Sequence, residues 1–287
     1  MRPALKQGLH WFGCTLAIAG VMFVIMHLYN FSADIDVSRF GTGTWLGIIA
    51  FSWIYGLANL MLAMAWWNLL EHFQVTVSGR WAIKTYGMTQ LAKYTPGNIF
   101  HLAGRQAVGM AAGLPGWPMA KSAVGELGLL SVAGAPFAIL VLPRWLPLFP
   151  LTWAALAFAC TISTIALAVW QYCGASAVRA FGWHCGFLAV SGLLFAGLVG
   201  LLADNLNSLL VIELCGAYIL AWLIGLVTPG APAGAGVREL ALLFFFKGVI
   251  GETDLLMAVI LGRVITVVGD LGFFGFTSLL KKRDSTP

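Results

Sequence analysis

The chain has 287 residues, of which 60% are hydrophobic and only 9% are charged, and its mean hydropathy is +0.89. A soluble domain carries roughly 25% charged residues, so this composition excludes an ordinary soluble protein and indicates a polytopic α-helical membrane protein. Continuous rather than alternating apolar runs exclude a membrane β-barrel. The net charge of +5 is typical of basic residues on cytoplasmic loops, and no basic run with interleaved aromatics suggests nucleic-acid binding.

The first part of the chain predicts two spans followed by two shorter helices. Residues 11–28 form the first apolar run, which we interpret as an uncleaved span because it continues past its small-x-small match. Residues 44–70 form the second span. The more polar segment 74–94 predicts an interfacial helix on the cytoplasmic side. A helix over residues 98–110 is too short to cross a membrane at 1.5 Å per residue, so we predict that it is re-entrant.

The rest of the chain predicts an all-α bundle of about eight spans in a single integral membrane domain, with approximate halves 1–145 and 146–287. Basic residues near both ends place both termini in the cytoplasm. Seven full spans would leave the C-terminus outside, so we expect a helix at about 236–250 to complete an eighth crossing. The remaining spans are expected at about 119–142, 151–172, 185–202, 208–227 and 254–280.

A repeated motif divides the chain into two related halves. Thr-Pro-Gly begins at Thr95 and again at Thr228, and an arginine follows ten residues after each threonine, at Arg105 and Arg238. Backbone that breaks a helix at membrane depth must be buried in protein or line a cavity. The pattern therefore predicts two internal repeats, inverted or parallel, each with a broken or re-entrant helix at a substrate site. The candidate turn residues are Pro96, Gly97, Pro229 and Gly230.

Both arginines are candidates for holding an anion. A helix N-terminus and a guanidinium together suit a phosphate, because the guanidinium binds phosphate oxygens bidentately. The alternative is that each arginine only ties its hairpin to a neighbouring carboxylate. Four further charged residues in apolar sequence complete the candidate site: Glu126, Glu239, Arg263 and Asp270.

Two of these acidic residues have more than one interpretation. Glu126 fits either an ion pair with Arg105 or a role in transport or proton coupling. Glu239 fits a partner for Arg105 or Arg263, whereas Glu213 is expected to be solvated near an interface. The histidines and cysteines show no metal-ligand spacing, so we expect neither a metal nor a cofactor. The absence of catalytic motifs favours transport over catalysis.

At these motifs the chain resembles the flippase-like proteins named for the transmembrane region of lysylphosphatidylglycerol synthase. The upstream pattern corresponds to Pro96-Gly97, Arg105 and Glu126, and the downstream pattern to Pro229 through Gly234-Ala-Gly236-Val-Arg238-Glu239. The chain departs from the family at Asn98-Ile-Phe-His101, where a small basic-Gly-Glu cluster is usual. The resemblance covers about residues 10–280. It implies a bacterial inner-membrane protein that moves a lipid, or a lipid-linked glycan, between leaflets.

The predicted function is therefore a lipid translocase for a phospholipid or a polyprenyl-phosphate-linked substrate. Arg105 and Arg238 would hold the phosphate, and Glu126, Glu239 and Asp270 would balance the arginines when the site is empty. One alternative is a membrane-embedded transferase acting on a lipid-linked sugar, with Glu126 or Glu239 as its base. Another is a non-transporting partner subunit of a glycosyltransferase or lipid synthase.

Overall fold

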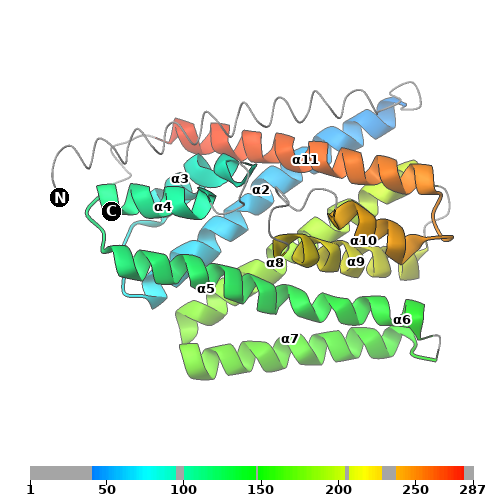
Figure 1. Ribbon diagram of the computed structural model, residues 1–287, viewed down its shortest axis with the longest axis horizontal. Coiled ribbons are helices and arrows are strands. Elements are labelled where there is room, and N and C mark those ends of the chain that lie inside the picture. Colours follow the sequence, from blue (N-terminus) through cyan, green and yellow to red (C-terminus); the bar gives the residue numbers. More distant parts are fainter. Residues whose placement is uncertain (1–40, 95–99, 147, 204–206, 228–236, 281–287) are drawn as a thin grey trace.

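The computed structural model describes residues 41–94, 100–146, 148–203, 207–227 and 237–280, and every regular element within these ranges is helical. Six helices in this part of the chain are long and apolar enough to cross a membrane, as expected of a multi-pass membrane protein. They run roughly along the long axis of the molecule (Figure 1). These helices are α2 (Thr42–His72), α5 (Gly116–Gly134) continued by η3 (Ala135–Val141) and α6 (Leu142–Trp145), α7 (Leu151–Cys173), α8 (Ala175–Leu202), α9 (Ser208–Val227) and α11 (Glu252–Leu279).

Most spans lie where the sequence predicts them, but α8 begins at Ala175 rather than at about residue 185. The sequence predicts a loop that contains Arg179 between the spans at 151–172 and 185–202, and this prediction is wrong because the chain is helical from Ala175 onward. Gly174 is the single residue between α7 and α8, and its φ of 84° lets the chain reverse direction there without a loop. Arg179 lies on the exposed first turns of α8 and pairs with Glu71 at 3.0 Å. The predicted first span, residues 11–28, lies outside the described residues.

The short helix α10 (Val237–Phe246) does not complete the crossing predicted for residues 236–250. Ten helical residues extend about 15 Å, which is half of the roughly 30 Å hydrocarbon core. The contacts of Arg144 in α6 show where α10 ends. Its Nη1 atom lies 2.8 Å from Oε2 of Glu213 near the start of α9, and its Nε donates to the carbonyl oxygen of Phe245 at 3.0 Å. The α9–α10 pair therefore returns the chain to the end of the bundle where α9 begins.

A second helical hairpin lies toward the opposite end of the bundle (Figure 1). It consists of α3 (Gly79–Gln90), the 3₁₀ turn η2 (Leu91–Tyr94) and α4 (Phe100–Ala111). Ser78 caps α3 by accepting a hydrogen bond from the backbone N–H of Trp81 at 3.2 Å. Gly104 lets α4 approach Thr89 of α3 closely. The predicted helix in segment 74–94 is confirmed, but more than half of the residues of α3 are buried against the bundle.

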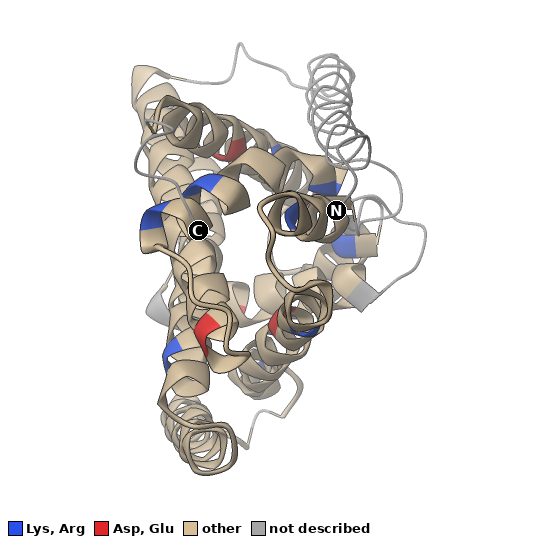
Figure 2. Cartoon of the chain, turned by 90° about the vertical axis from the view of Figure 1, so that its left-hand side faces the viewer, with Lys and Arg blue, Asp and Glu red and all other residues tan. Residues whose placement is uncertain are grey.

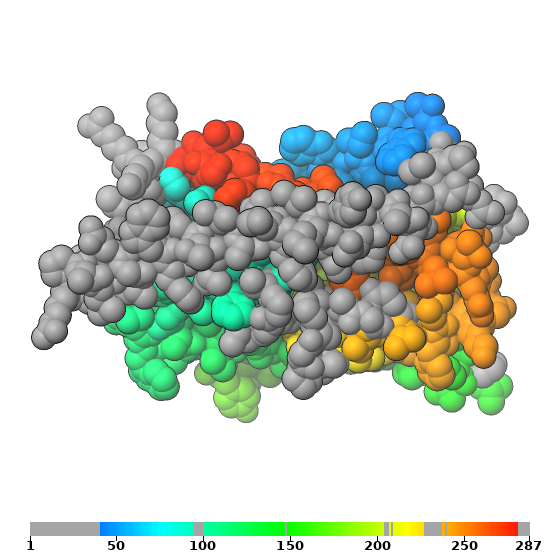
Figure 3. Space-filling view, turned by 45° about the horizontal axis from the view of Figure 1, so that its top comes forward, coloured from blue at the N-terminus to red at the C-terminus, as the bar shows by residue number. Residues whose placement is uncertain are grey.

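Helix α2 is the central element, and it packs against α3, α5, α8 and α11. The backbones of α2 and α11 come very close at Gly56 and Gly269, and parts of both helices, blue and red, lie along the upper edge of the space-filling view in Figure 3. A Cβ atom built on Gly269 would lie 2.8 Å from the carbonyl oxygen of Ser52 and 2.9 Å from the amide nitrogen of Gly56. Small residues permit this approach, which is the usual way that membrane helices pack tightly.

We expect Gly269→Ala to destabilise the protein by about 1–3 kcal/mol, because the added methyl group collides with backbone atoms that cannot rotate away. Gly272→Ala is the matched control on the same helix, since a Cβ there meets nothing within 4 Å. Thermal unfolding of both variants in detergent measures the difference. Equal midpoints for the two variants would contradict close packing of α2 on α11.

Candidate functional site

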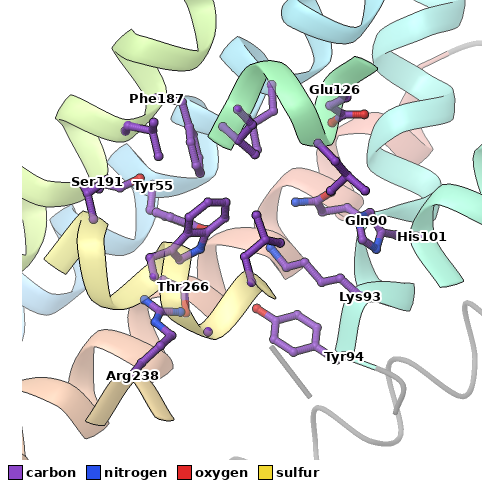
Figure 4. A pocket seen from close by; sticks show the side chains of 18 of the residues that line it. Tyr55, Gln90, Lys93, Tyr94, His101, Glu126, Phe187, Ser191, Arg238 and Thr266 are labelled. Atoms are coloured by element: carbon purple, nitrogen blue, oxygen red, sulfur yellow. The ribbon is translucent and has the colours of Figure 1, made fainter. Parts of the chain in front are cut away.

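A cavity of about 110 Å³ lies between the two hairpins. Lys93, Tyr94 and His101 reach it from η2 and α4, whereas Arg238 and Tyr218 reach it from α10 and α9. Figure 4 shows Arg238 and Lys93 approaching the cavity from different sides. Aromatic rings form much of the remaining wall, namely Tyr55, Tyr86, Phe187 and Trp222. The cavity thus combines cations with the polar edges of aromatic side chains.

Arg105 forms a buried ion pair with Glu126, and only the glutamate is among the residues that line the cavity. Nη1 of Arg105 lies 2.6 Å from Oε2 of Glu126, and each residue is 3% exposed. Tyr86 donates its hydroxyl to Oε1 at 2.9 Å, and its ring lies 4.2 Å from the guanidinium carbon. Burial, followed by the charge of Glu126, raises the pKa of Tyr86 well above its usual value, so the phenol stays a donor.

This arrangement matches the alternative in which Arg105 ties its hairpin to a neighbouring carboxylate. Both oxygens of Glu126 are bound, one by Arg105 of α4 and one by Tyr86 of α3. The glutamate belongs to α5, so the pair joins the α3–α4 hairpin to a membrane-spanning helix. Trp66 of α2 lies under the same guanidinium at 5.3 Å and donates to Ser122 of α5 at 3.2 Å.

Asp270 is the centre of a second buried network. Its carboxylate is fully buried and lies 2.7 Å from Nζ of Lys93. Asn59 donates to Oδ1 at 3.1 Å, and the hydroxyl of Tyr94 donates to Oδ2. Gln90 in turn donates to the amide oxygen of Asn59 at 3.1 Å. Asp270 therefore balances a lysine, rather than one of the predicted arginines, and joins α11 to α2 and to η2.

Two arginines from different helices line the cavity directly. Arg238 of α10 lies over the ring of Tyr218 at 5.1 Å, and within the described part of the chain it forms no ion pair. Arg263 of α11 is 9% exposed and shares a helical face with Asp270, as the seven-residue spacing predicts. Thr266 lies between them in sequence and also lines the cavity. The structure thus brings Arg238, Arg263 and Glu126 together at the cavity. Arg105 and Asp270 do not line the cavity, but each forms an ion pair with a residue that does.

The remaining candidates from the sequence lie outside the described residues. These are the turn residues Pro96, Gly97, Pro229 and Gly230, together with the side chain of Glu239. The prediction for Glu213 is wrong: the residue is 4% exposed and pairs with Arg144 at 2.8 Å instead of being solvated. That pair fixes the outer ends of the α9–α10 hairpin.

Sequence reasoning missed Lys93, Tyr94 and Asn59. Lys93 belongs to segment 74–94, which was predicted to lie on the cytoplasmic side, but it lines the cavity and its side chain is 19% exposed. The sequence contained one indication that Lys93 and Tyr94 belong to the site, because they immediately precede the first Thr-Pro-Gly motif. Asn59 carried a weaker signal as an amide within a long apolar run, where a polar group needs a partner.

Among the residues described by the structure, no group of three or more histidine, cysteine, aspartate or glutamate side chains could hold a metal ion. His101 lines the cavity on its own. Burial, and then the charges of Arg105 and Lys93, lower the pKa of His101 well below its usual value. The imidazole therefore adds no charge to the cavity, and its Nδ1 atom has no hydrogen-bond partner among the described residues.

The sequence was also compared with known proteins. A scan against protein-family models and a search of curated proteins both return no match. The residues of the site are therefore the basis for assigning a function.

We expect Arg105→Met to destabilise the protein by about 3–5 kcal/mol, because it leaves the Glu126 carboxylate buried without its cation. The double variant Arg105→Met/Glu126→Gln should regain much of this loss, since neither charge then remains. Unfolding in detergent checks both expectations.

Arg179→Met is the control, because its pair with Glu71 is more than half exposed on both sides. An exposed pair contributes about 0–1 kcal/mol. If Arg105→Met proved as stable as Arg179→Met, the buried pair would not hold the α3–α4 hairpin.

Proposed function

We propose that the protein is a lipid translocase and that the cavity between the two hairpins holds the phosphate of a lipid head group. The observation that carries the proposal is the convergence of Arg238, Arg263 and Lys93 on one cavity. Glu126 is the sole carboxylate among the described lining residues, and Arg105 and Tyr86 already bind it. The cavity therefore favours an anion, and guanidinium groups suit phosphate oxygens.

The size of the cavity narrows what it would hold. A volume of about 110 Å³ is small beside the roughly 300–1,000 Å³ of typical small-molecule sites. The phosphate of a phospholipid or polyprenyl phosphate fits this space better than a whole glycan does. Any sugar on the lipid would lie outside the cavity in the conformation described.

The two hairpins extend the proposal to topology. The α3–α4 and α9–α10 pairs lie toward opposite ends of the bundle, and a Thr-Pro-Gly motif falls between the helices of each pair. This placement supports inverted repeats with two re-entrant hairpins. Full crossings would then be α2, α5–α6, α7, α8 and α11, together with the predicted span at residues 11–28. Helix α9 is long enough to cross, but in this proposal it forms a re-entrant hairpin with α10. Six crossings and two hairpins make eight membrane-inserted units and return both termini to one side.

The orientation in the membrane follows from charge. Figure 2 shows several basic residues at the end of the molecule that carries the α3–α4 hairpin. Arg80 and Lys84 belong to α3 itself, and Lys121 and Arg179 lie near the starts of α5 and α8. Basic residues concentrate on the cytoplasmic side, so we place this end and both termini in the cytoplasm. The family resemblance adds a bacterial plasma membrane as the location.

The geometry argues against Glu126 as the base of a transferase. A general base must reach a substrate proton, but both oxygens of Glu126 already accept hydrogen bonds within the protein. The partner-subunit alternative requires a glycosyltransferase or lipid synthase to supply activity, and it predicts that loss of the cavity arginines is tolerated. The exchange assay below separates both alternatives from translocation.

We expect purified protein in liposomes to exchange labelled phospholipid or polyprenyl phosphate between leaflets, and Arg238→Ala to slow exchange at least tenfold. Loss of one bidentate charge-assisted contact, of about 1.5–3 kcal/mol, accounts for a change of this size. Arg179→Ala is the matched control, because this arginine is exposed and distant from the cavity wall.

Unchanged exchange by folded Arg238→Ala would overturn the phosphate site. The absence of exchange by the wild type with either probe would instead favour the transferase or the partner subunit. Detection of a chemically altered lipid would identify the former.

The topology has its own test, based on the two ends of α7. Cys173 is exposed at its C-terminal end, and Leu148 is 98% exposed just before its N-terminal end. Two variants are compared, one with Leu148→Cys and one with Cys173 as its single cysteine. In right-side-out vesicles, an impermeant thiol reagent should label the first and should not label the second. The reverse pattern would invert the orientation, and labelling of both from one side would exclude α7 as a crossing.

A further inference from the structure

Asp270 has a property that phosphate binding alone does not explain. Its side chain is fully buried, yet one of its three hydrogen-bonding partners is Lys93, which also lines the cavity. The lysine is 19% exposed, whereas the aspartate is not exposed at all. The same ammonium group can therefore serve either the buried carboxylate or an anion in the cavity.

The chemistry of lysine makes this exchange feasible. Its ammonium is a compact charge on a flexible four-carbon stem, so it can shift without moving the backbone of η2. Asn59 and Tyr94 would remain on Asp270 after the shift, and they supply hydrogen bonds without charge. A buried carboxylate that keeps its charge but loses its cation is strongly unfavourable. Such a group takes up a proton instead.

We propose that Asp270 is a proton-binding site, and that it takes up one proton when Lys93 moves from it to the phosphate of the bound lipid. This inference rests on the proposed function, because it needs an anion in the cavity. In the step, the carboxylate becomes a carboxylic acid and the ammonium keeps its proton. The proton comes from water. Lipid phosphate and a proton then bind together and leave together, which couples translocation to a proton gradient.

Two arginines line the same cavity, Arg263 on the helix of Asp270 and Arg238 on α10. Both charges are permanent, so neither side chain can take up the proton that accompanies the lipid. An anion bound to these arginines would add a negative charge to the cavity that Lys93 also lines.

Other titratable groups near Asp270 do not supply the proton. The tyrosines that face it are Tyr94 from η2, Tyr55 from α2 and Tyr86 from α3. Burial, and then the charge of Asp270, raise the pKa of Tyr94 well above its usual value, so its phenol keeps its own proton. Asn59 and Gln90, the other polar neighbours, do not titrate. Solvent is therefore the source of the proton.

The test is binding of dihexanoylphosphatidylglycerol to the purified full chain by titration calorimetry. Its phosphodiester keeps one negative charge across the working pH range, so any pH dependence belongs to the protein. Repeating the titration in buffers of different ionisation enthalpy counts the protons taken up. We expect about one proton per bound lipid, and a dissociation constant that rises about tenfold per pH unit where the coupling operates.

Two variants change this result in different ways. Asp270→Asn should bind without proton uptake and, at high pH, at least as tightly as the wild type, because Lys93 is already free to meet the phosphate. Lys93→Gln should bind more weakly and with no pH dependence, since its Asp270 is protonated before the lipid arrives. Arg179→Gln, on the exposed surface, should retain the wild-type pH dependence.

Infrared difference spectra provide an independent signature. Lipid binding should produce the carbonyl band of a protonated carboxylic acid in the wild type and not in Asp270→Asn. Wild-type binding without proton uptake would overturn the coupling and leave the phosphate site intact. Proton uptake that persists in Asp270→Asn would also overturn the coupling. If Asp270→Asn does not fold, proton uptake that persists in Lys93→Gln would have the same meaning. A wild type that binds no probe at any pH would refute the proposed function itself, and the coupling with it.

Discussion

The ion pair between Arg105 and Glu126 is the interaction on which the cavity depends. It joins the α3–α4 hairpin to α5 at 2.6 Å, in a position that is 3% exposed at both residues. It also neutralises a carboxylate that lines the cavity. Without that compensation, Glu126 would repel a phosphate and balance the arginines on the opposite wall. One interaction thus holds a hairpin in place and gives the cavity its preference for anions.

The two hairpins resemble each other in sequence but differ in charge balance. On the α3–α4 side, Arg105 and Lys93 each have a carboxylate partner from a membrane-spanning helix, Glu126 or Asp270. On the α9–α10 side, Arg238 lies over the ring of Tyr218 and, as far as the described residues extend, has no acidic partner. The cations of the first hairpin are therefore compensated by carboxylates, whereas the second hairpin, which Arg144 and Glu213 hold at its outer end, presents the charge of Arg238 to the cavity. This difference suits a substrate that must bind and then leave.

Most of the helical spans were predictable from the sequence, because they follow from local composition. Runs of apolar residues predicted α2, α5, α7, α9 and α11, and each Thr-Pro-Gly motif falls in the sequence between the two helices of a hairpin. The roles of the two arginines were not predictable, since identical spacing conceals different tertiary partners. Lys93 was misplaced for a similar reason: a lysine beside a polar segment suggests a cytoplasmic surface, and nothing local reveals a buried aspartate 177 residues later. The start of α8 was missed because Arg179 was taken as a loop residue, although a helix end tolerates an exposed charge.

The central claim is that a lipid phosphate binds between the hairpins, and a structure of the protein in lipid nanodiscs tests it most directly. Electron cryo-microscopy with excess anionic phospholipid should show phosphate density within hydrogen-bonding distance of both Arg238 and Arg263. The Arg105–Glu126 pair should be intact in the same map. A cavity without phosphate density, with lipid head groups confined to the two ends of the bundle, would contradict the account.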